Sequence, residues 1–172
     1  MKFEIVKEMM VQRNFKEYKI KEDNYIIGVT MNTLGNNEYI YIKIYPGKFE
    51  IKVVREFLST KFNIHNEGVT TKISNKNVVQ LIIICKSFQN SHVKEFKELS
   101  PHIQLIRSDF FNINITKKAP SHLKVDGSII KNKKELPILK ISDPNCIFYN
   151  FVKGDLIKII RSDGEVCYRL VR

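Results

Sequence analysis

Residues 141–172 have the sequence ISDPNCIFYNFVKGDLIKIIRSDGEVCYRLVR. Asp143 followed by Pro144 predicts the start of a helix, because an aspartate side chain accepts hydrogen bonds from free backbone amides and proline suits the first helical turn. We expect this short helix to end at Asn150, since asparagine tolerates the left-handed conformation that often terminates a helix. This part of the chain therefore begins with a helix whose two ends are both specified locally.

A β-hairpin is expected after the short helix. The Lys-Gly-Asp at 153–155 predicts a turn into a strand over 156–161. The Ser-Asp-Gly-Glu at 162–165 predicts a tight turn, after which a second strand covers 166–171. These residues form no catalytic constellation, and their turns specify a compact surface, so we interpret the stretch as an assembly module.

The residues upstream predict a larger lobe of mixed structure. The expected helices cover residues 3–13, 49–62 and 91–100, and the expected strands cover residues 25–30, 38–45, 77–85 and 102–107. Asn90 or Ser91 is expected to cap the third helix. The order strand, helix, strand over 77–107 implies a right-handed crossover and a parallel pair of strands. The expected fold class is α/β (α+β), with a mixed-sheet lobe over residues 1–116 and an assembly module over residues 117–172.

The chain is basic throughout. Its 172 residues hold 29 Lys and Arg against 18 Asp and Glu, a formal net charge of +11. The excess is spread over both expected domains rather than gathered in one tail. Such a field suits a polyanionic partner such as nucleic acid. The alternative is a solvated, lysine-rich surface that reflects the composition of an AT-rich genome.

Several classes of function are not expected. The apolar runs are of strand length, so we predict no membrane span, and the amino terminus does not resemble a signal peptide. Cys85, Cys146 and Cys167 lie far apart in sequence, which favours reduced, mostly buried thiols over a disulfide framework or a metal site. The four histidines are scattered. We therefore expect no metal, no cofactor and no small-molecule ligand.

Several motifs in the chain resemble one family. The motifs are Val6–Met10 with Arg13–Phe15, Asn114-Ile115-Thr116, Pro120-Ser121-His122, Leu136-Pro137-Ile138, Ser142-Asp143-Pro144, Gly154-Asp155 with the strand after it, and Tyr168-Arg169. Together they resemble the RNA polymerase subunit that is fifth by size and is shared by the three eukaryotic nuclear enzymes, and equally its archaeal counterpart. The resemblance covers nearly the whole chain and is most specific in the last 36 residues or so.

The resemblance implies a non-catalytic subunit of a multisubunit DNA-directed RNA polymerase. The assembly module would dock on the largest polymerase subunit, and the lobe, with an inactive restriction-endonuclease-like fold, would form part of the lower jaw near downstream duplex DNA. The docking residues would be Pro120, His122, Leu136, Pro137, Asp143, Pro144, Gly154, Asp155, Arg161, Tyr168 and Arg169. The DNA-proximal residues would be Lys86, Gln89, Ser91, Lys94 and Lys97, with weak, sequence-independent contacts to phosphates.

The chain departs from the family pattern in ways that suggest a virus or a parasite with a reduced genome. Asn150 stands where the family has glycine, residues 123–135 are fewer than in the family, and Gln89–His92 replace a Thr-Pro-Ser-Ala motif. We expect residues 123–135 to form a loop. The site of action would be the nucleus for a cellular protein, and a cytoplasmic viral factory or the virion for a viral one.

Some alternatives remain open. For Asp143 we favour a helix cap over an acid–base role, and for His122 a packed, hydrogen-bonded imidazole. Arg161 and Arg169 pair either with a partner protein or with Asp155 and Glu165.

Two other functions compete with the polymerase interpretation. One is a free-standing nucleic-acid-binding protein. The other is a metal-dependent nuclease that uses Glu50 and Lys52, with Asp23 as the second carboxylate.

Overall fold

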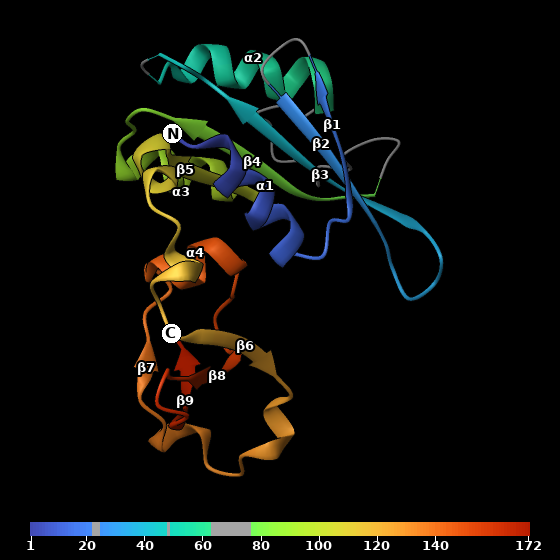
Figure 1. Cartoon of the computed structure of the whole chain (residues 1–172). Coiled ribbons are helices and arrows are strands. Elements are labelled where there is room, and N and C mark those ends of the chain that lie inside the picture. Colours follow the sequence, from blue (N-terminus) through green and yellow to red (C-terminus); the bar gives the residue numbers. More distant parts are fainter. Residues whose placement is uncertain (22–24, 48, 63–76) are drawn as a thin grey trace. The chain divides into compact units, whose positions relative to one another are not determined.

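The computed structural model describes residues 1–21, 25–47, 49–62 and 77–172. The fold is α+β, as predicted. The chain divides into two compact units, an N-terminal unit, Met1–Asn112, and a C-terminal unit, Ile113–Arg172. Each unit contains its own β-sheet with short helices (Figure 1).

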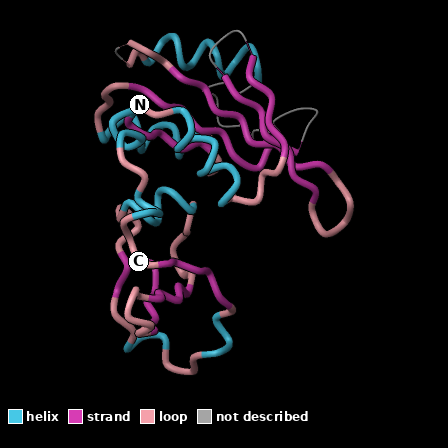
Figure 2. The backbone as a smooth tube through the Cα atoms, in the orientation of Figure 1, coloured by secondary structure: helices cyan, strands magenta, loops and turns pink. Residues whose placement is uncertain are grey.

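The N-terminal unit is built on a five-stranded mixed sheet with the order β1-β2-β3-β4-β5. The strands are β1 (Glu17–Lys21), β2 (Tyr25–Met31), β3 (Asn37–Ile44), β4 (Asn77–Cys85) and β5 (Ile103–Arg107). β1, β2 and β3 pair in antiparallel fashion, whereas β3, β4 and β5 are parallel. Figure 2 shows the strands in magenta. The predicted parallel pair of β4 and β5 is therefore confirmed.

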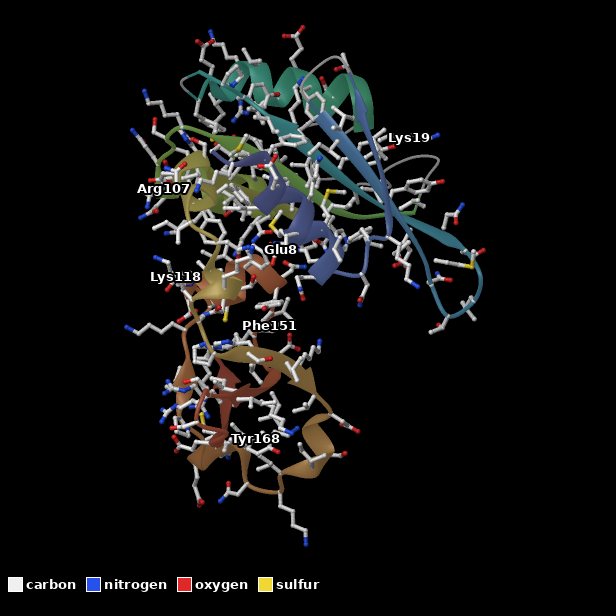
Figure 3. All side chains as sticks on the ribbon, viewed as in Figure 1. Glu8, Lys19, Arg107, Lys118, Phe151 and Tyr168 are labelled. Atoms are coloured by element: carbon white, nitrogen blue, oxygen red, sulfur yellow. The ribbon has the colours of Figure 1, made fainter. Side chains whose placement is uncertain are left out.

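Strand β1 was not predicted. Its sequence EYKIK has few apolar residues, so it carries little of the alternation that identifies a strand. The strand lies at the edge of the sheet, where charged residues are favoured because they discourage pairing with other chains. Lys19 is exposed there, and its side chain extends away from the sheet (Figure 3).

Helices cover both faces of this sheet. They are α1 (Phe3–Gln12), α2 (Ile51–Phe62) and α3 (Asn90–Leu99), and the 3-10 helix η1 (Ser108–Asn112) follows β5. α2 and α3 share one apolar core with alternate residues of β4, among them Leu81 and Ile83. Met10 of α1 lies against Gly28, on the face that also carries Ile82. Residues 81–85 of the central strand are fully buried as a result, as the continuous apolar run predicted.

Gly28 allows α1 to approach the sheet closely. A Cβ atom built on this residue would lie 2.5 Å from Met10 Cε, 2.6 Å from Ile40 Cγ2 and 3.3 Å from Phe15 Cβ. The first two distances are shorter than any normal contact between carbon atoms. The absence of a side chain at Gly28 is therefore a packing requirement of this unit.

The C-terminal unit contains a four-stranded sheet with the order β6-β8-β9-β7. Its elements are η2 (Ile115–Lys117), β6 (Ser121–Val125), η3 (Gly127–Ile129), η4 (Lys133–Glu135), β7 (Ile138–Leu139), α4 (Pro144–Tyr149), β8 (Leu156–Ile160) and β9 (Val166–Val171). The predicted helix and hairpin are confirmed as α4, β8 and β9. Strands β6 and β7 were not predicted, and residues 123–135 hold the end of β6 and two 3-10 turns where a loop was expected.

Local backbone conformation agrees with the turn residues. Asn14 and Asn150, at the ends of α1 and α4, have φ angles of 67° and 59°. Gly154 and Gly164 have φ angles of 97° and 86° in the two predicted turns. Asparagine and glycine are the residues that adopt this left-handed conformation at least cost.

Candidate functional site

The residues expected to dock a partner all lie in the C-terminal unit, but they serve different purposes there. His122 is buried, and its Nδ1 lies 2.7 Å from the carbonyl oxygen of Pro120. Its register partner on β8 is Ile159, which is also buried. His122 is therefore a packed, hydrogen-bonded imidazole, as the sequence predicted, and it contributes to the core of the unit.

Asp143 caps helix α4. Its Oδ1 accepts a hydrogen bond from the backbone amide of Asn145 at 2.8 Å, and Pro144 occupies the first turn. Asn150 ends the helix in the left-handed conformation. The structural interpretation of Asp143 is confirmed.

Asp155 joins the loop before β8 to strand β6. Its Oδ2 accepts a hydrogen bond from the amide of Val152 at 2.9 Å, and its Oδ1 lies 2.8 Å from Lys124 Nζ. The side chain of Asp155 is only 10% exposed, whereas that of Lys124 is largely exposed. Lys124 was not among the predicted residues, because its strand β6 was not predicted. The alternation in Ser-His-Leu-Lys-Val was the available signal.

The two arginines differ in their contacts. Arg161 forms an ion pair with Glu165 across the hairpin turn, which is one of the pairings that the sequence left open. Arg169 Nη1 donates to the carbonyl oxygen of Ile138 at 3.4 Å. Asp155 pairs with Lys124 and not with either arginine.

The other expected docking residues differ in exposure. Pro120, Pro137, Pro144 and Gly154 are exposed, while Leu136, Tyr168 and Arg169 are partly buried. The structure thus brings the predicted set into one small unit and divides it into residues that hold the fold and residues that remain available at the surface.

The expected DNA-proximal residues lie on or just before helix α3. Lys86 follows strand β4, and Ser91, Lys94 and Lys97 belong to α3. All are exposed, as is Gln89. The structure therefore gathers this set around one helix of the N-terminal unit.

The cap of α3 was predicted incorrectly. The N-cap residue is Gln89, and Asn90 and Ser91 are already helical. The Gln89 amide donates to His92 Nδ1 at 3.4 Å. The imidazole of His92 lies against the ring of Phe49, with 4.7 Å between the centroids. This contact with the core favours an earlier start of the helix over a cap at the intrinsically better residues Asn90 or Ser91.

A buried arginine was not predicted from the sequence. Arg13 Nη1 donates to Gln80 Oε1 at 2.6 Å, and Nη2 donates to Gln104 Oε1 at 3.0 Å. Burial lowers the pKa of the Arg13 guanidinium from its ordinary value to about 9. The cluster ties the end of α1 to β4 and β5. Gln80 and Gln104, each within an apolar strand, were the signals that a buried polar partner was needed.

The residues of the nuclease alternative do not form a visible site. Glu50 and Lys52 are exposed at the start of α2. Asp23 lies outside the described residues. Among the residues that the structure describes, no three His, Cys, Asp or Glu side chains gather in a way that would hold a metal ion. Within the same residues, no helix is long and apolar enough to cross a membrane.

The cysteines are free thiols. Burial raises the pKa of Cys85 and that of Cys146 to about 11, with the carboxylates of Asp143 and Asp155 adding to the effect at Cys146. Cys167 is partly exposed. The pKa of the Tyr45 hydroxyl is raised to about 12. Burial is the larger cause, and the nearby Cys85 is the smaller one. The two buried thiols and the Tyr45 hydroxyl are protonated near neutral pH and are not activated nucleophiles.

Comparison with known proteins gives the family. A protein of invertebrate iridescent virus 3, named "Uncharacterized protein 092R", is 59% identical over 175 residues that cover both chains completely. The chain belongs to the 092R family. No protein-family model matches it.

A second, more distant relative is named after a polymerase subunit. The protein named "Putative DNA-directed RNA polymerase subunit 454R", from invertebrate iridescent virus 6, is 25% identical over 192 residues, which cover 99% of this chain and 97% of the relative. The similarity extends through both units. Both relatives come from iridescent viruses, which supports a viral origin for the chain.

Proposed function

We propose that this chain is a non-catalytic subunit of a viral DNA-directed RNA polymerase, of the family that includes the fifth-largest eukaryotic subunit and its archaeal counterpart. The observation that carries the proposal is the similarity to 454R, which extends over both units. The fixed turn at Gly154 falls in the Gly154-Asp155 motif, which resembles that family.

The C-terminal unit docks on the largest polymerase subunit. In support, the polar residues of the motif that lie inside the unit are used for its own architecture, as His122, Asp143 and Asp155 illustrate. What remains at the surface is a set of rigid prolines and basic side chains. A surface of this kind suits permanent assembly because it loses little conformational entropy on binding.

The N-terminal unit lies near duplex DNA ahead of the transcribing enzyme. Its exposed Lys86, Lys94 and Lys97 form no ion pair within 4 Å in the described part of the chain. Lysines that contact phosphates hold a duplex without reading its sequence and allow it to slide. This is the property that a polymerase jaw requires.

The test is purification of the tagged full chain from cells infected with its virus, with the retained proteins identified by mass spectrometry. Recovery of the two largest polymerase subunits in stoichiometric amounts is the expected result. A tagged, unrelated basic protein of the virus controls for adhesion through charge. Recovery of the chain alone, together with magnesium-dependent DNA cleavage that Lys52→Ala abolishes, would overturn the proposal in favour of a nuclease.

A further inference from the structure

The two faces of the C-terminal sheet differ in what covers them. The strand register places His122, Ile159 and Cys167 in one row on the inner face, where Ile157 and Val171 pack with α4 residues in the core. Leu123, Lys158 and Tyr168 form a row on the opposite, outer face, and Ser121, Ile160 and Val166 form the next row. Tyr168 is labelled in Figure 3.

The outer face is apolar and partly open. Leu123 is 47% exposed and Val166 is 43% exposed, while Ile160 and Tyr168 are partly buried. In the neighbouring row, Leu156 is buried. Most of the side chains in the two open rows are therefore apolar or aromatic, and Lys158 stands among them.

Strand β6 forms one edge of this sheet. It has five residues, and Ser121, Leu123 and Lys124 are exposed. Within the described part of the chain, its backbone pairs with β8 on one side and with no strand on the other. The opposite edge, β7, has only two residues and offers a shorter template. An edge strand with one unpaired side offers free backbone N–H and C=O groups, to which a strand of another chain can pair.

The charges of the unit indicate the chemistry of the partner. Every acidic side chain of residues 113–172 is already engaged within the unit. Asp126, Asp143 and Asp163 accept hydrogen bonds from backbone amides, Glu135 accepts one from Asn132, and Asp155 and Glu165 form ion pairs with Lys124 and Arg161. Among the described residues, no ion pair within 4 Å involves Lys117, Lys118, Lys131, Lys133, Lys134, Lys140, Lys153 or Lys158. The charge left for an external partner is thus positive.

We propose that the β6 edge and the outer face receive an extended segment of a partner protein, which adds as a fifth strand beside β6 and directs both apolar and acidic side chains toward the outer face. The apolar side chains would lie beside Leu123, and the acidic ones would meet Lys158 and its neighbours. The assignment rests on the proposed function, in which this partner segment belongs to the largest polymerase subunit. A second copy of this chain is a poorer occupant, because it would bring the same excess of lysines.

The decisive measurement is hydrogen exchange of the full chain, free and bound to the co-expressed largest polymerase subunit. Strand addition gives the outward amides of β6 hydrogen-bond acceptors. We expect peptides that cover residues 121–125 to exchange at least about tenfold more slowly in the complex, with little change in peptides that cover α4.

Two matched variants test the side-chain part of the proposal. Leu123→Asp places a carboxylate on the outer face beside Lys158 and repels an acidic partner. Ile141→Asp makes the same chemical change at a residue that is 45% exposed and lies outside the β6, β8 and β9 strands. We expect Leu123→Asp to weaken binding by about tenfold or more and Ile141→Asp to leave it within about twofold.

The outcomes separate this inference from the proposed function. If the wild-type chain binds the largest subunit and β6 exchanges at the same rate in both states, strand addition is wrong and the polymerase assignment stands. If no binding occurs, the proposed function fails and this inference fails with it. If β6 becomes protected as the concentration of the free chain is raised and a dimer is seen by sedimentation, a second copy is the occupant and the proposed partner is wrong. Because exchange uses the wild-type chain, the test does not depend on whether Leu123→Asp folds.

Discussion

The sheets of the N-terminal and C-terminal units are covered by helices to different extents. In the N-terminal unit, α1 covers one face, α2 and α3 cover the other, and the residues of the central strand β4 from Leu81 to Cys85 are fully buried. In the C-terminal unit, α4 and the loop after it cover the inner face, while much of the outer face remains open. The first unit is complete by itself. The second retains apolar surface that a partner would cover.

The difference also extends to the source of stability. The N-terminal unit has 112 residues and a large apolar core, whereas the C-terminal unit has 60 residues and relies on caps, ion pairs and left-handed turns. At about 0.05–0.15 kcal/mol per residue, the two units would have about 6–17 and 3–9 kcal/mol of stability. The smaller unit therefore has less tolerance for damage to its core.

The largest expected loss of stability comes from replacing one buried isoleucine by alanine in the core of each unit. Ile157→Ala and Ile83→Ala both remove buried methyl groups and should each cost about 2–5 kcal/mol. We expect Ile157→Ala to raise hydrogen exchange throughout residues 121–171 nearly to the rate of an unfolded chain. Ile83→Ala should lower protection in the N-terminal unit and leave it folded.

The control for this pair is exchange in the unmutated unit of each variant, which should match the wild-type chain. Loss of protection in both units of Ile157→Ala would mean that they unfold together, and the comparison between them would then be invalid.

A change at Gly28 should have the next largest effect. Gly28→Ala forces Met10 and the branched side chain of Ile40 to move, because the new Cβ would lie within 2.6 Å of both. We expect a loss of about 1–3 kcal/mol in the N-terminal unit, measured by urea unfolding followed with segment-resolved exchange. Gly47→Ala, where a Cβ meets no atom within 4 Å, is the matched control. Equal stabilities of the two variants would show that α1 does not need this close approach.

The left-handed asparagines allow the same test in both units. Asn14→Ala and Asn150→Ala each place alanine at a left-handed φ angle and should each cost about 1–2 kcal/mol. Asn14→Gly and Asn150→Gly should be nearly neutral, because glycine adopts this conformation freely. In thermal unfolding, the Tm values of Asn150→Ala and Asn150→Gly should differ by more than those of Asn14→Ala and Asn14→Gly, since the C-terminal unit is the less stable one. A penalty for glycine as large as that for alanine would show that the side chain, and not the φ angle, matters.

The raised pKa values of the buried thiols predict that both alkylation and stability depend on pH. The pKa values of Cys85 and Cys146 are about 11 in the folded chain, so about one thiol in a thousand is ionised at pH 8. Alkylation at pH 8, followed by mass spectrometry, should modify the partly exposed Cys167 first. The unfolded chain ionises its thiols above about pH 9, so the stability of both units should fall between pH 9 and pH 11. Faster labelling of Cys146 than of Cys167 would contradict the burial of the C-terminal core.

The smallest effect is expected for the lysines near α3. Replacing Lys86, Lys94 and Lys97 by alanine removes three exposed charges from the N-terminal unit and should leave its stability unchanged within about 0.5 kcal/mol. The assembled polymerase should bind duplex DNA more weakly, and the slope of log affinity against log salt should fall by roughly one for each phosphate that the variant no longer neutralises. Lys117→Ala with Lys118→Ala in the C-terminal unit is the control. An unchanged slope would place the DNA-binding residues elsewhere.

Much of each unit was predictable because its signals are local. The helical spacing of apolar residues identified α1 and α2, and the continuous apolar run identified β4. Asp143, Asn150 and Gly154 marked a cap, a helix end and a turn whose geometry depends on neighbouring residues alone. Strands β1 and β7 were missed because β1 is charged and β7 is only two residues long, so neither carries much periodicity, whereas the five residues of β6 carried an alternation that was overlooked.

The sequence by itself determined the caps, the left-handed turns, the period of each main element and the basic character of both units. The tertiary structure alone decided which distant residues meet. It paired Lys124 with Asp155, placed Gln80 and Gln104 on Arg13, and left the row of Leu123 and Tyr168 open. The physical reason is strand register, because a shift of one residue moves every side chain of a strand to the other face, and no local signal specifies which strand will lie alongside.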